Sequence, residues 1–212
     1  MQKLSVFDKL IVEVDRALRV VTGDLSLSTR PTPAADLPEA PLSPAEQQHV
    51  GGLMRINHAG EVCAQALYQG QALTAELKEV RQQMEVAAIE EWDHLAWCEQ
   101  RLNELNSHTS YLNPVWYLGA FSIGAFAGFI GDRWSLAFVA ETERQVVKHL
   151  EEHQARLPAQ DQRSLAILTQ MQIEEEVHGQ TAKEAGAAEF PSLVQWAMSK
   201  VSKIMTTTSY YI

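Results

Sequence analysis

The sequence has few of the residues that β-sheets and nucleic-acid-binding surfaces require. Its 212 residues include only 11 glycines, and runs of Val, Ile, Thr and aromatic residues typical of strands are missing. Lysine and arginine number 17 against 27 acidic residues, so the formal net charge is −10. Such a surface would not neutralise phosphates. We therefore expect an all-α protein with no nucleic-acid partner.

Cysteines and leader signals are also scarce. Cys63 and Cys98 lie inside helical patterns, at no spacing that suits a metal or a disulfide framework. Both are expected to be small apolar core residues in a reducing compartment. No secretory signal opens the chain, and the acidic Asp8, Glu13 and Asp15 argue against an organelle transit peptide. These features indicate a cytoplasmic, bacterial setting.

The N-terminal fifth of the chain differs from the rest. Residues 4–22 carry apolar positions at helical spacing, and Gly23 ends the pattern. Five of the eight prolines fall in residues 24–44, which cannot continue a helix and should form a semi-extended linker. The run Ser43–Pro–Ala–Glu46 is a helix start signal. We predict an appendage of residues 1–43 and one domain of residues 44–212.

Within that domain the periodicity predicts four long helices, at 44–75, 79–106, 132–156 and 159–187. Residues 115–130 form a sixteen-residue uncharged segment between the second and third of them. That is shorter than the roughly 20 residues a membrane span needs. A last helix is expected at 191–206. The predicted fold is a ferritin-like four-helix bundle with an added apolar helix and a C-terminal amphipathic helix.

Two Glu-x-x-His pairs interrupt the apolar faces of these helices. They are Glu91–Trp–Asp–His94 and Glu175–Glu–Val–His178. Residues three apart share one side of a helix, so each pair can hold one metal ion. Ionisable groups on an apolar face are unfavourable unless something pairs with them. One such pair by itself is commonly accidental, and the duplication is what makes the pattern informative.

A further glutamate lies upstream of each pair. The interval corresponds to about one helix, a turn and half of the returning helix. Glu61 lies 30 residues before Glu91, and Glu143 lies 32 before Glu175. Two matching half-sites predict a dinuclear carboxylate centre inside a helical bundle. Four carboxylates and two neutral imidazoles carry a charge that two divalent ions cancel, and this oxygen and nitrogen set suits iron or manganese better than zinc or calcium. The predicted ligands are Glu61, Glu91, His94, Glu143, Glu175 and His178.

Other polar residues near these positions have less certain roles. Glu90 and Glu174 precede the ligand glutamates and are placed either to orient a ligand histidine or to face solvent. For His58 and His149 a supporting or packing role is expected rather than ligation. The remaining histidines, His49, His108 and His153, are expected at the surface.

The apolar segment and the C-terminal helix favour contact with a membrane surface. Residues 115–130 are either a buried helix or a lipid-facing one. In the last helix an apolar stripe runs beside Lys200 and Lys203, which is typical of helices in the membrane interface. Glycines at 119, 124 and 128 permit close helix contact, either between subunits or within one chain.

The motifs Arg55–Ile–Asn–His–Ala–Gly–Glu61, Glu91–Trp–Asp–His94 and Glu174–Glu–Glu–Val–His178–Gly, with the Glu143 helix, resemble the demethoxyubiquinone hydroxylases of ubiquinone biosynthesis. The resemblance covers about residues 46–212. It implies a di-iron monooxygenase, peripheral on the cytoplasmic side of the bacterial inner membrane. The implied reaction hydroxylates the ring of a polyprenylated quinol with O2 and electrons from NADH.

The same resemblance carries the six ligands over to the positions predicted above. It also allows a homo-oligomer and contacts with other ubiquinone-biosynthesis proteins. Two departures exist: family members often have Asp where Asn57 stands, and many begin near residue 44. No G-x-G-x-x-G motif is present, so NADH would bind without a dedicated domain or act through the quinone.

Three other functions fit the core pattern. A ferroxidase or iron-storage protein would use the same six ligands but form a cage, and a peroxide-handling manganese catalase would need no quinone. A membrane-associated helical scaffold with merely structural acidic pairs is the non-enzymatic alternative. Metal analysis of the purified protein separates this last case from the others.

Overall fold

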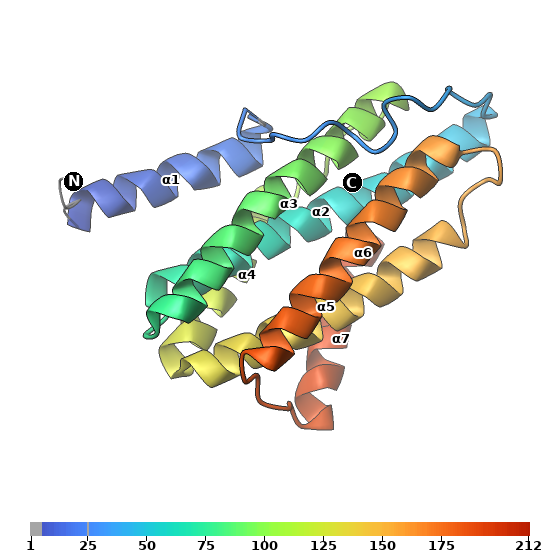
Figure 1. Ribbon diagram of the computed structural model, residues 1–212. Helices are drawn as coiled ribbons and strands as arrows, with labels where there is room; N and C mark the ends of the chain where they lie inside the picture. Colours follow the sequence, from blue (N-terminus) through green and yellow to red (C-terminus); the bar gives the residue numbers. More distant parts are fainter. Residues whose placement is uncertain (1–5, 25) are drawn as a thin grey trace.

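The computed structural model describes residues 6–24 and 26–212, and within these ranges the chain forms seven helices and no strand. Figure 1 shows α2, α3, α5 and α6 lying side by side as a bundle, with α4 and α7 packed outside it. The all-α prediction is confirmed. In chain order the helices are α1 (Val6–Thr22), α2 (Pro44–Thr74), α3 (Lys78–Glu104), α4 (Asn113–Ile130), α5 (Asp132–Gln154), α6 (Gln162–Glu184) and α7 (Ser192–Ser209).

The start signal at the beginning of α2 works as predicted. The Ser43 hydroxyl accepts from the Glu46 backbone N–H at 3.3 Å, and the Glu46 carboxylate accepts from the Ser43 backbone N–H at 2.8 Å. This reciprocal cap satisfies two of the donors that a helix start leaves free. Pro44 occupies the first turn, where its missing N–H is not needed.

Two apolar clusters of the bundle core have a polar layer between them, and a third cluster packs α1 and α4 against α2 and α3. One cluster contains Met54, Leu102 and Leu168, and the other contains Tyr68 and Met84. On each of the four bundle helices, the residues predicted to bind metal fall between the residues of these two clusters in sequence. The apolar clusters therefore hold the helices together on both sides of the charged groups. Cys98 is buried in the first cluster, as expected, whereas Cys63 is only partly buried.

Helix α4 packs closely along α2 through glycine. A Cβ atom on Gly124 would lie 2.2 Å from the backbone oxygen of Leu67, and one on Gly128 would lie 2.1 Å from the Thr74 hydroxyl. Gly124 and Gly128 therefore make a close helix contact within one chain, which is one of the two roles considered for these glycines. Gly119 meets nothing within 4 Å. Across the residues that the structure describes, no helix is long and apolar enough to cross a membrane.

Before the bundle, the chain forms α1 and then an irregular segment. Helix α1 ends at Gly23, which has φ +73°, and residues 4 and 5 of the predicted helix lie outside the described residues. Residues 26–43, called the strap below, run across α3 and α6 (Figure 1). Arg163 on α6 donates to the backbone oxygens of Ala34 and Leu37 in the strap. The division of the chain at residue 43 stays a prediction.

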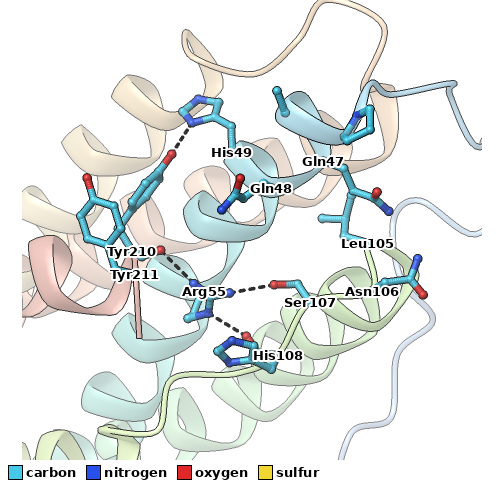
Figure 2. A pocket seen from close by; sticks show the side chains of 12 residues that line it. Gln47, Gln48, His49, Arg55, Leu105, Asn106, Ser107, His108, Tyr210 and Tyr211 are labelled. Carbon is cyan, nitrogen blue, oxygen red and sulfur yellow. Dashed lines mark hydrogen bonds between the residues drawn. The ribbon is translucent and has the colours of Figure 1, made fainter.

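The C-terminus closes one end of the bundle. Figure 2 shows the hollow there, of about 660 Å³, in which Arg55 donates to Ser107 Oγ and to the backbone oxygens of His108 and Tyr210. Tyr210 also hydrogen-bonds His49, which is half-buried. Arg55 thus ties the end of α7 and the loop after α3 to the start of α2.

Candidate metal centre

The six predicted ligand residues meet in the middle of the bundle. Glu61 comes from α2, Glu143 from α5, and the two Glu-x-x-His pairs from α3 and α6. His178 is half-buried, and the other five side chains are buried. The antiparallel course of the helices places each upstream glutamate near the pairs, as the matching intervals predict.

Four of the six share one possible coordination site. Ligand atoms of Glu61, Glu91, His94 and Glu175 all lie within 4.8 Å of one another. His94 Nδ1 is 3.0 Å from Glu91 Oε2, 3.0 Å from Glu175 Oε1 and 3.5 Å from Glu61 Oε2. The imidazole nitrogen and three carboxylates therefore converge on a single point.

Glu143 and His178 lie outside that group of four and adjoin it through Glu91 and Glu175. His178 Nδ1 is 3.0 Å from Glu175 Oε2 and 3.6 Å from Glu91 Oε1. Glu143 accepts a short hydrogen bond from the Tyr68 hydroxyl. Glu91 and Glu175 approach both imidazoles, so these two carboxylates occupy the central position between the half-sites.

Each of the four carboxylates has one buried oxygen atom without a hydrogen-bond partner. Glu61 Oε2, Glu91 Oε1, Glu143 Oε2 and Glu175 Oε1 are buried and accept no hydrogen bond. A buried polar atom without a partner costs about 1–3 kcal/mol, and a charged one costs more. One free oxygen on each of four converging carboxylates is the donor set that two divalent ions need. The residues present therefore fit a pair of metal ions.

The titration of the cluster reflects burial and mutual repulsion. Burial, followed by the charge of Glu175, raises the pKa of Glu91 and of Glu143 well above the usual value. Burial acts on Glu175 in the same sense, but the hydrogen bond from His178 and the charge of the nearby His94 imidazole lower the pKa of Glu175 to about 2.

The pKa of both imidazoles is raised. Burial would lower the pKa of each, but the surrounding carboxylates outweigh it. The charge of Glu91 raises the pKa of His94 well above the usual value, and the hydrogen bond with Glu175 raises the pKa of His178 to about 11. The metal-free cluster thus holds protons where metal ions would otherwise supply positive charge.

Glu90 and Glu174 both reach across to a histidine of the opposite helix. His94 Nε2 is 2.7 Å from Glu174 Oε2, and His178 Nε2 is 2.5 Å from Glu90 Oε2. Of the two roles considered for these glutamates, orientation of a histidine is the one the geometry supports. An acceptor on Nε2 places the ring proton there and turns the Nδ1 lone pair toward the centre.

The structure adds residues that the sequence reasoning missed. Tyr68 lies two helical turns after Glu61 on the same face of α2, a spacing that was available as a signal. Arg30 of the strap binds Glu174 and Asp93, and no local pattern pointed to it.

The remaining histidines lie apart from these contacts. His58 hydrogen-bonds Asn113, and His149 stacks on His153 with ring centroids 6.3 Å apart. The prediction that His153 is a surface residue is wrong, because it is buried and hydrogen-bonds Asn57 at 2.9 Å. Burial lowers the pKa of His153 to about 3, so it is a neutral packing residue. His108 is exposed, as expected.

A groove of about 490 Å³ leads to the His178 side of the cluster. It includes Tyr68, Glu90 and His178, so it touches the half-site that is less deeply enclosed. Apolar side chains form much of its wall: Met84, Val86, Ala87, Val139, Val177 and Ala182. An apolar groove that ends at a few polar groups is the usual form of a small-molecule site.

A helical bundle with a buried cluster of four carboxylates and two imidazoles defines a ferritin-like protein with a candidate dinuclear centre. The fold agrees with a solved thioferritin, the bacterioferritin-related protein from Bacteroides fragilis. That match has a TM-score of 0.55 at 18% identity and covers 89% of this chain and 98% of the other. The chain belongs to the family of ubiquinone biosynthesis protein COQ7, whose model matches residues 48–209. The family resemblance read from the motifs is thereby confirmed.

Curated relatives extend the match to the whole chain. The 3-demethoxyubiquinol 3-hydroxylase of Legionella pneumophila (strain Paris) is 56% identical over 213 residues, which cover 100% of both chains. Proteins with the same name from Nitrosococcus oceani and Polynucleobacter necessarius are 55% and 54% identical. Those two alignments cover 100% and 99% of this chain, and 99% and 100% of the relatives. The matches therefore include the strap, which lies before the region of the family model.

Proposed function

We propose that this protein is a di-iron 3-demethoxyubiquinol hydroxylase that uses O2. The observation that carries the proposal is the convergence of four carboxylates, each with one unpartnered buried oxygen, between two imidazoles. The name shared by relatives that match the full length of the chain supports the same reaction. It favours the hydroxylase over the ferroxidase and peroxide-handling alternatives.

The proposed ligands are the six residues predicted from the sequence. Glu61 would serve the ion beside His94, Glu143 the ion beside His178, and Glu91 and Glu175 would lie between the two ions. When bound, the iron pair supplies the activation of dioxygen. The protein's own residues hold the ligands in place: Glu174 and Glu90 keep the Nε2 protons, so both Nδ1 atoms stay directed at the centre.

The apolar groove beside His178 is the proposed entry for the quinol ring. Met84, Val139 and Val177 give it apolar walls that suit an aromatic ring and exclude water. Tyr68 contributes to the groove and donates its hydroxyl proton to Glu143. The Tyr68 side chain thereby separates the groove from the carboxylate and fixes which oxygen of Glu143 remains free.

We further propose that the protein lies on the cytoplasmic face of the bacterial inner membrane, where the prenyl tail of the substrate remains in lipid. The outward faces of α4 and α7 are apolar, and Lys200 sits over the Trp196 ring at 5.5 Å, a combination typical of interfacial helices. NADH is the proposed electron source, acting without a dedicated domain. The exposed apolar side chains are Val115, Leu118, Ile123, Phe126, Phe129 and Ile130 on α4, and Leu193, Trp196, Val201 and Ile204 on α7.

The proposal is tested by assaying the reaction with labelled oxygen. The purified protein is loaded with ferrous iron without air, mixed with NADH and a short-chain demethoxyquinone, and exposed to heavy-isotope oxygen gas. Mass spectrometry should find a product heavier by one labelled oxygen atom. Two bound irons with no labelled product would contradict the hydroxylase and favour a ferroxidase.

A further inference from the structure

The two halves of the centre match in their ligands but not in their surroundings. The His94 side chain is 0% exposed and its partner Glu174 is 17% exposed. On the other half, His178 is 9% exposed and its partner Glu90 is 45% exposed and borders the groove. Two half-sites of the same composition are thus enclosed to different degrees.

Arg30 of the strap pairs with Glu174, on the more enclosed half. Its Nη1 and Nη2 atoms lie 2.6 Å and 3.0 Å from the two oxygens of Glu174, as a bidentate fork. Glu174 Oε2 is also the atom that holds His94 Nε2. For Glu90, in contrast, the described residues provide one hydrogen-bond partner, His178.

The Arg30 side chain is itself held in place. Its Nε lies 2.5 Å from Asp93 Oδ2, and Trp97 Nε1 donates to the Arg30 backbone oxygen at 3.3 Å. The guanidinium lies 4.8 Å from the centroid of the Trp97 ring. Asp93 Oδ1 accepts further hydrogen bonds from Ser28 and Thr29. These contacts restrict the Arg30 side chain independently of Glu174. Pairing with Glu174 therefore costs little further side-chain entropy.

A merely structural contact is the alternative reading of the same bonds. The strap has other attachments, because Arg101 on α3 pairs with Glu39 at 2.7 Å and Arg163 on α6 binds the backbone of Ala34 and Leu37. The strap therefore does not need Glu174 in order to stay on the bundle. The fork on Glu174 has its direct effect on the carboxylate that orients His94.

We propose that Arg30 is a positioning residue of the metal centre: through Glu174 it fixes the His94 imidazole, so that the ion beside His94 is retained more tightly than the ion beside His178. The inference rests on the proposed di-iron site. It makes the strap, which lies before the residues matched by the family model, part of the working enzyme. It also assigns the exchangeable ion to the half-site that borders the groove.

Release of iron to a chelator tests the proposal in the full chain. Protein loaded anaerobically with two equivalents of ferrous iron is mixed with excess ferrozine, and the coloured complex is followed with time. Wild type should lose one iron quickly and the second slowly. In Arg30→Met the slow phase should accelerate by up to about 10–100-fold, the usual effect of losing the hydrogen-bond partner of a ligand, here transmitted through Glu174, while the fast phase is unchanged.

Arg19→Met is the matched control. Arg19 also pairs with two carboxylates of the N-terminal region, at 2.7 Å and 2.6 Å, and is 33% exposed, against 39% for Arg30. Both phases should remain as in wild type. The Glu174→Gln variant completes a double-mutant cycle: if Arg30 acts through Glu174, the double variant should release iron no faster than Glu174→Gln alone.

Several results would overturn the inference. These are a single release phase in wild type, equal acceleration of both phases in Arg30→Met, or effects of Arg30→Met and Glu174→Gln that multiply. If circular dichroism shows that Arg30→Met does not fold, Arg30→Lys takes its place, since it keeps the charge without the fork and should accelerate only the slow phase. The labelled-oxygen assay distinguishes the two claims, because unequal release without product would refute the hydroxylase alone.

Discussion

Adding metal ions to the metal-free protein should release protons in a number that the structure specifies. The surrounding carboxylates raise the pKa of His94 and His178, so both imidazoles are protonated at neutral pH, and burial raises the pKa of Glu91 and Glu143 well above the usual value. Each of these groups must be deprotonated before it binds a divalent ion. The two imidazolium protons give a release of at least about two protons per two ions bound, and the raised pKa of Glu91 and Glu143 can only add to that number.

The same count determines how metal affinity depends on pH. Each proton released raises the overall binding constant tenfold per pH unit, so two ions together should gain at least about two log units per pH unit, roughly tenfold per ion. The dependence holds at pH values below the raised pKa values, which for His178 is about 11. Acidification therefore releases the metal, and a rise in pH strengthens its binding.

Proton release can be counted directly. Anaerobic ferrous iron is titrated into weakly buffered protein at neutral pH with an indicator dye, and calorimetry in buffers of different ionisation enthalpy provides a second count. A release of one proton or none per two ions would refute this account of the cluster's charge.

Four further substitutions test the fold and the site. Gly124→Ala should lower the free energy of unfolding by about 1–3 kcal/mol in a urea titration, because the added Cβ meets the Leu67 oxygen at 2.2 Å. Gly119→Ala, with open space around it, should instead raise that free energy by about 0.5–1 kcal/mol, and equal effects of the two would contradict the packing of α4. Arg101→Met should lower the free energy of unfolding by about 3 kcal/mol, since it leaves the buried Asp161 carboxylate without its cation, and a loss under 1 kcal/mol would contradict that role. Glu143→Ala should abolish hydroxylation with little change in helical circular dichroism, and near-native turnover would remove it from the ligand set.

The arrangement of the metal centre was largely predictable because helices impose it. A spacing of three residues places Glu91 and His94 on one face whatever surrounds them, and the same holds for Glu175 and His178. The matching intervals from each pair back to Glu61 and to Glu143 predict that these glutamates lie on the antiparallel neighbouring helices. Helix starts were predictable for a similar reason, since the Ser43 cap depends only on residues within one turn.

Contacts between distant parts of the chain were not predictable in this way. Arg30 is 63 residues from Asp93 and 144 from Glu174, and no periodic pattern connects them. The burial of His153 depends on Asn57, 96 residues away on α2. A semi-extended strap was expected from its prolines, but its path over α3 and α6 follows from individual ion pairs that composition does not reveal.

The central claim is that six side chains hold two metal ions in the bundle, and diffraction at the iron absorption edge tests it most directly. A crystal of the ferrous-loaded protein should give two anomalous peaks, one beside Nδ1 of His94 and the other beside Nδ1 of His178. Glu91 and Glu175 should lie between the peaks. A single peak, or iron bound away from these side chains in a fully loaded crystal, would contradict the account.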